Sequence, residues 1–186
     1  ESTSFILRLP DRKPIRAEVP LLGKHSAENV ALAALLAAEM GLSEEEIERG
    51  IGEIQPVPHR LRLIESGGVK VLDDSYNSNP RGAREALAAL RRFSGRKIVV
   101  TPGLVETGIL DETLNGELGA ELCGLDLVLL VGDTQVGAVK KGYLDAGGDA
   151  DKIFVYPTLE RAKDVLSETL CAGDCVLFLN DLPDAY

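Results

Sequence analysis

Seven polar side chains follow one another at residues 73–79, where an apolar strand pattern gives way to a helix pattern. The segment 73–80 reads Asp-Asp-Ser-Tyr-Asn-Ser-Asn-Pro. Asn79, directly before Pro80, fits the N-cap of a helix whose first turn holds the proline. The remaining carboxylates, hydroxyls and amides exceed what a cap needs, and all of them can hydrogen-bond to a ligand. The segment therefore predicts a polar-ligand site between a strand and a helix.

Two further clusters could take part in the same chemistry. Residues 23–29, Gly-Lys-His-Ser-Ala-Glu-Asn, precede a predicted helix, and Ser26 as its N-cap is the structural alternative there. His59 and Arg60 follow a proline-rich connection. They fit either a solvated pair at the start of a strand or a guanidinium that binds phosphate.

Composition narrows the class of protein. The formal net charge is −10 over 186 residues and the pI is about 4.7, which disfavours nucleic acid or an anionic membrane as a partner. No apolar run approaches the ~20 residues of a membrane span. Cys123, Cys171 and Cys175 lack zinc spacing, and core packing is expected for Cys123 and Cys175 in a reducing cytoplasm. No phosphate-binding loop of the form G-x-x-x-x-G-K-[ST] is present.

The first 57 residues predict a small unit of two strands and two helices. Strands are expected at residues 5–7 and 15–19, and a helix at residues 26–41 whose apolar residues lie nearly all round it, which implies burial. Ser43 and Glu46 form the sequence pattern of a capping box for a second helix. Pro56 and Pro58 then mark the best candidate for a domain boundary.

After residue 58 the pattern changes to alternating strands and helices. A hairpin is expected around Gly67-Gly68, between strands at 61–65 and 69–72. The later strands are expected at 97–100, 127–131, 153–156 and 175–179, separated by helices at 80–93, 111–123, 134–146 and 158–171. This alternation predicts an α/β fold with a mostly parallel, doubly wound sheet. Ligands of such sheets bind beyond the carboxyl ends of the strands, where the polar loops lie.

The three clusters together resemble the Mur ligase family. The matching residues are Gly23, His25, Asn29, Ala33, Ala34, His59, Arg60 and the segment 73–80. The resemblance is greatest to the subgroup that adds D-alanyl-D-alanine to a UDP-N-acetylmuramoyl-tripeptide, from whose typical loop only Ser78 differs. It implies that residues 1–57 are the C-terminal tail of a central ATP-binding domain. Residues 58–186 would then be the Rossmann-like C-terminal domain, with the phosphate-binding loop and the magnesium ligands upstream of this chain.

The resemblance also implies a role for individual residues. Asn29 would contact adenine, His59 would pack near the base, Arg60 would reach a phosphate as the catalytic cation, and Asp74 would accept from the ribose hydroxyls. Asp73 would orient the loop from behind. Tyr76, Asn77 and Asn79 would shape the cleft that faces the incoming amino substrate. No metal ligand is assigned within the chain.

The implied reaction is ATP- and magnesium-dependent amide bond formation in peptidoglycan precursor synthesis, through an acyl phosphate. The expected protein is a cytoplasmic monomer, and this chain alone is expected to be inactive. Two alternatives stay open. One is another amide ligase of the superfamily, of the folylpolyglutamate or cyanophycin synthetase type. The other is a non-catalytic nucleotide-binding module.

Overall fold

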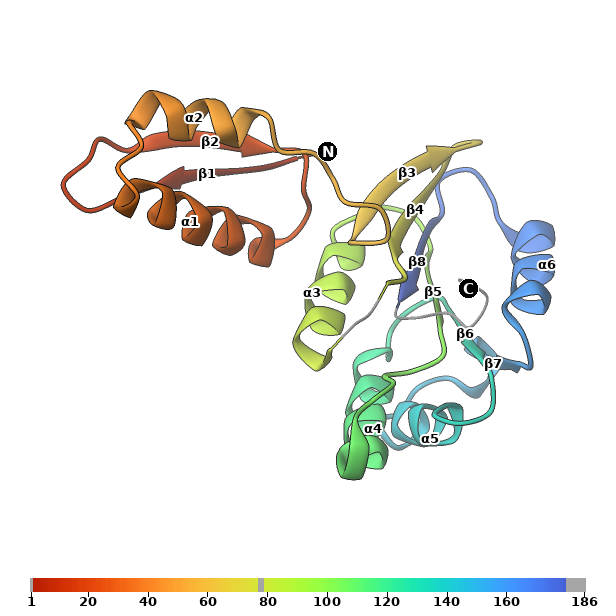
Figure 1. Ribbon diagram of the computed structural model, residues 1–186. Helices are drawn as coiled ribbons and strands as arrows, with labels where there is room; N and C mark the ends of the chain where they lie inside the picture. The colour runs from red at the N-terminus through yellow and green to blue at the C-terminus, as the bar shows by residue number, and fades with distance from the viewer. Residues whose placement is uncertain (1, 77–78, 180–186) are drawn as a thin grey trace. The chain divides into compact units, whose positions relative to one another are not determined.

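The computed structural model describes residues 2–76 and 79–179. It divides into two compact units, Glu1–Val57 and Pro58–Tyr186 (Figure 1). That the first unit is the tail of an ATP-binding domain stays a prediction.

The first unit packs two helices against a two-stranded antiparallel sheet. Strand β1 (Thr3–Leu7) pairs with β2 (Ile15–Val19), and the helices are α1 (Lys24–Glu39) and α2 (Glu44–Gly52). Alternate residues of β2 are buried, as a strand with one core face requires. The core of the unit contains Ile15, Ala17, Val19, Val30, Ala34, Ile47 and Ile51. The predicted capping box of Ser43 and Glu46 is confirmed, with both reciprocal hydrogen bonds present.

Two expectations for α1 are wrong. The helix begins at Lys24, so Ser26 lies inside it rather than at its cap, and its Oγ donates to the carbonyl oxygen of Leu22 at 2.8 Å. The helix is also not buried all round, because Leu32 is 68% exposed and Leu36 is 62% exposed. One face packs on the unit's core, whereas the other face has no covering element within the described part of this unit.

The second unit contains a six-stranded sheet in the order β3-β4-β8-β5-β6-β7. Its strands are β3 (Arg62–Ser66), β4 (Val69–Asp74), β5 (Lys97–Thr101), β6 (Leu127–Val131), β7 (Ile153–Tyr156) and β8 (Cys175–Leu179). β3 pairs antiparallel with β4, and every other pairing is parallel. The predicted α/β fold with a mostly parallel sheet is confirmed.

Within the described residues of this unit, four helices cover the sheet, and the connectivity decides which face each one covers. They are α3 (Pro80–Arg91), α4 (Asp111–Glu121), α5 (Val136–Asp145) and α6 (Leu159–Thr169), accompanied by the short 3-10 turns η1 (Gly108–Leu110) and η2 (Ala150–Lys152). The chain proceeds outward from β4 through β5 and β6 to β7, and then returns to place β8 between β4 and β5. Because crossovers are right-handed, the helix of the returning connection lies on the opposite face from the others. Figure 1 shows α6 on one side of the sheet and α3 on the other.

The two faces of the sheet bury alternate residues of the same strands. Leu159, Ala162 and Leu166 of α6 pack with the set Ile98, Val100, Leu129, Val131 and Val176. The intervening residues, such as Leu72, Val99 and Leu177, are also fully buried, and the register places them side by side on the α3 face. Cys175 is buried in β8, as expected for a core residue. Cys123 is half-buried, with its thiol against the carbonyl oxygen of Tyr143.

Glycines let α4 and α5 approach each other closely. A Cβ atom added to Gly119 of α4 would overlap the backbone carbonyl of Val139 in α5. A Cβ atom added to Gly142 of α5 would likewise overlap the backbone of Gly116 in α4. The two backbones are therefore in direct contact at two places along the helix pair.

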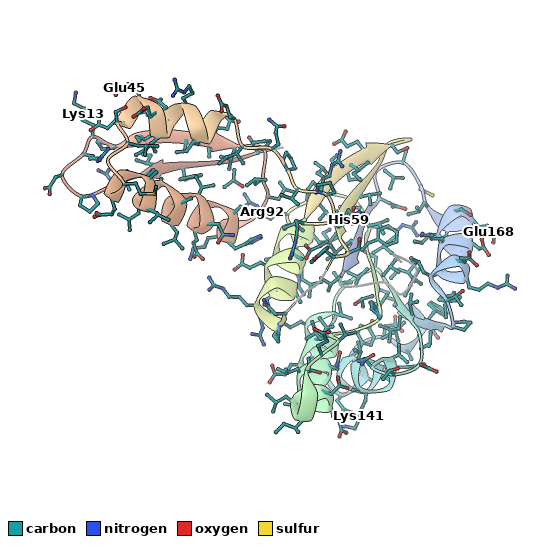
Figure 2. The ribbon with its side chains drawn as sticks, viewed as in Figure 1. Lys13, Glu45, His59, Arg92, Lys141 and Glu168 are labelled. Carbon is teal, nitrogen blue, oxygen red and sulfur yellow. The ribbon has the colours of Figure 1, made fainter. Side chains whose placement is uncertain are left out.

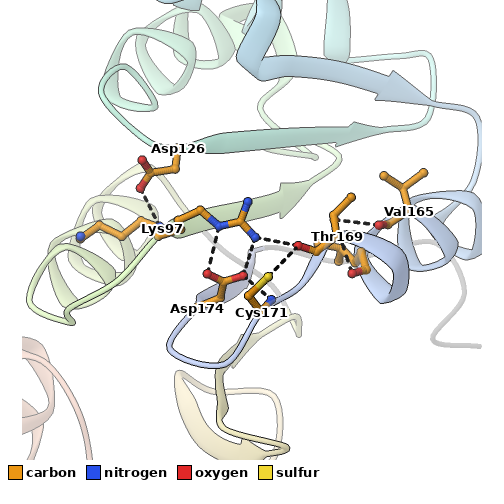
Figure 3. Close-up of polar contacts among 8 residues, drawn as sticks. Lys97, Asp126, Val165, Thr169, Cys171 and Asp174 are labelled. Atoms are coloured by element: carbon orange, nitrogen blue, oxygen red, sulfur yellow. Dashed lines mark hydrogen bonds and ion pairs between the residues drawn. The ribbon is translucent and has the colours of Figure 1, made fainter.

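An ion pair closes the edge of the sheet opposite the carboxyl ends of the parallel strands. Arg96 donates through Nε to Asp174 Oδ1 at 3.0 Å and through a terminal nitrogen to Oδ2 at 2.6 Å (Figure 3). The same carboxylate accepts from the Cys171 amide at 2.8 Å, and Arg96 also donates to the carbonyl oxygen of Thr169. Asp174 is buried and Arg96 is half-exposed. The pair fixes the connection from α6 to β8 against the start of β5.

This ion pair should make stability depend on pH. The Arg96 guanidinium and, to a lesser degree, the Cys171 amide hold the pKa of the Asp174 carboxyl below its ordinary value. Because the folded pKa is the lower one, the stabilisation is complete above the unfolded pKa of about 3.9 and is lost as the pH falls through the folded pKa. Asp174→Asn should lower the free energy of unfolding at pH 7 by about 1–3 kcal/mol.

Chemical denaturation between pH 3 and pH 8 checks this. The difference in the free energy of unfolding between wild type and Asp174→Asn should shrink as the pH falls below about 4, because the carboxyl of the unfolded chain then binds a proton that the native carboxyl, with its lower pKa, does not yet bind. Asp145→Asn is the control, because its partner Lys141 is exposed and such pairs contribute little. If the difference in the free energy of unfolding between wild type and Asp174→Asn stayed constant down to pH 3, the charge of Asp174 would not be what stabilises the connection.

Candidate functional site

The candidate site lies at the carboxyl edge of the sheet, where two segments distant in sequence meet. β3 runs antiparallel to β4 with Arg62 opposite Asp73, so the residues before β3 lie beside the residues that end β4. Residues 59–61, called the Arg60 turn below, therefore lie against residues 73–76. The sequence singled out both segments but did not predict that they touch.

His59, Asp73 and Ser75 form a hydrogen-bonded cluster at this edge. His59 Nδ1 lies 2.9 Å from Asp73 Oδ2, and Ser75 Oγ donates to Asp73 Oδ1 at 2.7 Å. Ser75 Oγ also lies 3.2 Å from His59 Nδ1. With Nδ1 directed at the carboxylate, Nε2 is the ring nitrogen left to face a ligand. Asp73 thus orients the side chains around it, and His59 lies beside the start of β3 (Figure 2).

Arg60 stacks on Tyr76. The guanidinium carbon lies 4.2 Å from the centre of the phenol ring, and both residues are exposed. The Tyr76 amide also donates to the carbonyl oxygen of His59 at 3.2 Å, which joins the two segments through the backbone. Stacking uses the face of the guanidinium, so its in-plane N–H groups keep the geometry that suits a phosphate.

Asp74 reaches the Arg60 turn from the opposite side of the strand to Asp73. Its Oδ1 accepts a hydrogen bond from the Leu61 amide at 3.0 Å. Asp73 and Asp74 are neighbours on a strand, where successive side chains alternate between the two faces, and they have different partners. The two carboxylates hold different parts of one short turn.

Asn79 is the N-cap of α3, as predicted. Its Oδ1 accepts from the Gly82 amide at 2.9 Å, and Pro80 occupies the first turn. The side-chain oxygen thus has a structural function, and the role of Asn79 toward an amino substrate stays a prediction. Asn77 and Ser78 lie outside the described residues.

The structure brings His59, Arg60, Asp74, Tyr76 and Asn79 to one edge of the second unit. Asn29 belongs to the first unit, where it is exposed in the second turn of α1. Its assignment to the adenine base stays a prediction, as do the nucleotide and substrate roles of the other residues.

Asn115 is a residue of this region that the sequence reasoning missed. It is fully buried in α4, where its side chain accepts from the Leu104 amide at 2.7 Å and donates to the Leu104 carbonyl oxygen at 3.0 Å. Leu104 follows β5 and lines a small cavity together with Pro80 and Ala83 at the start of α3. Asn115 therefore fixes the loop after β5 beside the start of α3, the helix whose N-cap is Asn79.

A signal for Asn115 existed in the sequence. It precedes Leu118 by three residues and Leu122 by seven, so it falls on the apolar face of its helix. A buried amide in that position must be hydrogen-bonded.

The described residues contain neither a group of metal ligands nor a membrane-spanning helix. Within residues 2–76 and 79–179, no three His, Cys, Asp or Glu side chains are grouped as metal ligands would be. In the same part of the chain, no helix has the length and apolar character needed to cross a membrane.

Comparison with known proteins agrees with this architecture. The chain is 32% identical over 133 residues to UDP-N-acetylmuramoyl-tripeptide--D-alanyl-D-alanine ligase of Escherichia coli, covering 70% of this chain and 29% of the relative. It is 28% identical over 166 residues to the ligase of the same name in Bacillus subtilis, covering 86% of this chain and 36% of that one. The crystal structure of MurF from Acinetobacter baumannii superposes with a TM-score of 0.82 at 26% identity, over 97% of this chain and 39% of the neighbour.

The chain thus spans about a third of the length of these relatives. A sequence model of the family, described as Mur ligase, glutamate ligase domain, matches residues 59–180. That range includes the sheet with both segments of the candidate site. The chain belongs to the Mur ligase family.

Proposed function

We propose that this chain works as part of an ATP-dependent acid–amino-acid ligase of peptidoglycan precursor synthesis. The observation that carries the proposal is the interlocked pair of segments 59–61 and 73–76. It presents a guanidinium, an imidazole and a carboxylate together at the carboxyl edge of the sheet, where ligands of parallel sheets bind. Membership of the Mur ligase family supplies the class of reaction.

In the proposed reaction, the terminal carboxylate of a nucleotide-linked peptide takes the γ-phosphoryl group of ATP, which leaves ADP and an acyl phosphate. The amine of the second substrate attacks the acyl carbon, loses a proton and expels inorganic phosphate. Arg60 would donate its in-plane N–H groups to a phosphate, where negative charge must be stabilised. His59 would face the base, and Asp74 would accept from the ribose hydroxyls.

When bound, magnesium would supply positive charge that stabilises the phosphates in this scheme, and its ligands are proposed to lie outside the chain. Magnesium in such enzymes is usually held by one or two carboxylates together with the phosphates of the substrate, so few protein ligands are needed. Within the chain, the proposed contribution is to position nucleotide and amine and to exclude water when the domains close.

The finer proposal concerns the substrates. We infer that a UDP-N-acetylmuramoyl-tripeptide and D-alanyl-D-alanine are joined, because both relatives described above carry that name. Tyr76, Asn77 and Asn79 would face the incoming dipeptide, as their match to the loop of this ligase subgroup implies. Asn29 of the first unit would contact the adenine.

A coupled assay of the longer protein that contains this chain tests the proposal. With ATP, magnesium, the UDP-linked tripeptide and D-alanyl-D-alanine, we expect phosphate release that requires all four components. This chain alone should release no phosphate and should bind ATP very weakly in calorimetry. Its sequence has no phosphate-binding loop of the form G-x-x-x-x-G-K-[ST], and Asn29 and Asp74 would contact only the base and sugar. Micromolar ATP binding by the chain alone would contradict the proposal that tight ATP binding needs residues outside it.

The assay also separates the alternatives. Phosphate release with a folate and glutamate, but not with the dipeptide, would indicate a folylpolyglutamate type of ligase. Nucleotide binding by the longer protein without turnover of any amine would indicate a non-catalytic module.

A further inference from the structure

The backbone on both sides of Arg60 adopts a conformation that side chains disfavour. The φ angle is +61° at His59 and +47° at Leu61, and neither residue is glycine. Such residues stay in the left-handed region when the surrounding structure holds them there, and they are concentrated at functional sites. The contacts that hold these two residues therefore decide where Arg60 points.

Each of the two residues is held by a hydrogen bond from the neighbouring segment. The Tyr76 amide donates to the His59 carbonyl oxygen at 3.2 Å. Asp74 Oδ1 accepts from the Leu61 amide at 3.0 Å. Asp74 is the last residue of β4 and pairs in register with Leu179 of β8, so the sheet fixes its backbone. A carboxylate anchored in the sheet thus holds the residue that follows Arg60.

Burial strengthens the anchor. The Leu61 side chain is buried, whereas Arg60 beside it is exposed and stacked on Tyr76. If the Leu61 amide lost its acceptor, the turn could relax toward right-handed angles, which would move the guanidinium away from Tyr76. The other carboxylate, Asp73, contacts the His59 side chain and cannot replace this bond to the backbone.

We propose that Asp74 is a positioning residue for Arg60, which it holds in place through the Leu61 amide, in addition to any contact that it makes with ribose. This inference rests on the proposed function and deepens it. It predicts that part of the loss caused by changing Asp74 is a loss of the Arg60 contact.

Kinetics with two nucleotides separate this role from ribose binding. In the full-length ligase, Asp74→Ala should lower kcat/KM for ATP by roughly tenfold to a hundredfold. Part of this loss should remain with 2′,3′-dideoxy-ATP, which has no ribose hydroxyls for Asp74 to bind. Asp74→Asn keeps an acceptor for the Leu61 amide and should recover most of the loss with dideoxy-ATP.

A double-mutant cycle with 2′,3′-dideoxy-ATP, from which any ribose contact of Asp74 is absent, gives a second measurement. Asp74→Ala introduced into Arg60→Ala should cost less than about threefold, because the residue that it positions is already gone. Hydrogen exchange of the peptide that contains Leu61 should become faster in Asp74→Ala while the sheet keeps its protection. That result would show that the variant is folded and that the turn has loosened.

Two outcomes overturn the inference and leave the proposed function standing. One is an Asp74→Ala penalty that disappears with dideoxy-ATP, which would assign Asp74 to the ribose alone. The other is full additivity of the Asp74→Ala and Arg60→Ala losses. If Arg60→Ala itself had no kinetic effect, the phosphate contact in the proposed function would fail first.

Discussion

Replacing Arg60 with alanine should lower kcat/KM for ATP by roughly 100- to 1000-fold in the full-length ligase, as losing one preorganised donor to developing charge does elsewhere. Arg60 projects from a turn that Asp74 and Tyr76 hold in place, so little reorganisation is needed when it meets a phosphate. Arg60→Lys should recover only part of the loss, because an ammonium group cannot donate to two oxygens through a planar fork. Steady-state kinetics with varied ATP measure both variants.

Arg62 provides a matched control for this prediction. It is an exposed arginine two residues along the same chain, at the start of β3. Arg62→Ala removes the same charge from the same edge of the unit, so it reports any general electrostatic effect on nucleotide binding. Wild-type kinetics for Arg60→Ala, or equal losses for both variants, would show that Arg60 makes no specific phosphate contact.

The strands of the second unit could be predicted because their sequences leave few alternatives. Leu127–Val131 is a continuous apolar run, and it forms a strand whose interior residues are fully buried within a parallel sheet. Gly67 and Gly68 both have positive φ angles and join β3 to β4, as a two-residue hairpin turn requires. In these places local preference and tertiary structure agree.

The burial of α1 could not be predicted in the same way. Its apolar residues occur nearly all round, but only the face with Val30 and Ala34 meets the core of its unit. Amphipathic periodicity indicates which face packs when one face is polar. It gives no such indication when leucines such as Leu32 and Leu36 lie on the other face.

The residues of the candidate site could be predicted from the sequence, but their arrangement in space could not. Asp73, Asp74 and Tyr76 stood out because polar side chains were concentrated after an apolar strand. Their pairing with the Arg60 turn depends on the β3–β4 register and on left-handed angles at His59 and Leu61. Non-glycine residues adopt such angles because of tertiary contacts, so no local sequence pattern predicts them.

The packing of α4 on α5 leads to the largest stability effect that we expect. Gly119→Ala should lower the free energy of unfolding by about 3 kcal/mol, because overpacked cores lose 1–3 kcal/mol and occasionally more. The added methyl group would overlap the Val139 carbonyl and lie 2.8 Å from the Tyr143 amide nitrogen. Both neighbours are backbone atoms of α5, whose side chains at these positions are fully buried. Relief therefore requires the whole helix to move.

Gly116→Ala is the control from the same helix. A Cβ atom at Gly116 would have no atom within 4 Å. Helix propensity alone should then make Gly116→Ala neutral or more stable by up to about 1 kcal/mol. The two substitutions make the same chemical change in one helix. Chemical denaturation should show a lower free energy of unfolding for Gly119→Ala and an unchanged or higher one for Gly116→Ala.

A double variant extends the test of this interface. Gly142→Ala alone should also destabilise, since its Cβ atom would overlap the Gly116 backbone. Once Gly119→Ala has forced the helices apart, Gly142→Ala should cost less than it does alone, because the two sites share one interface. A Gly119→Ala variant as stable as wild type would mean that α4 and α5 are further apart than their glycines indicate.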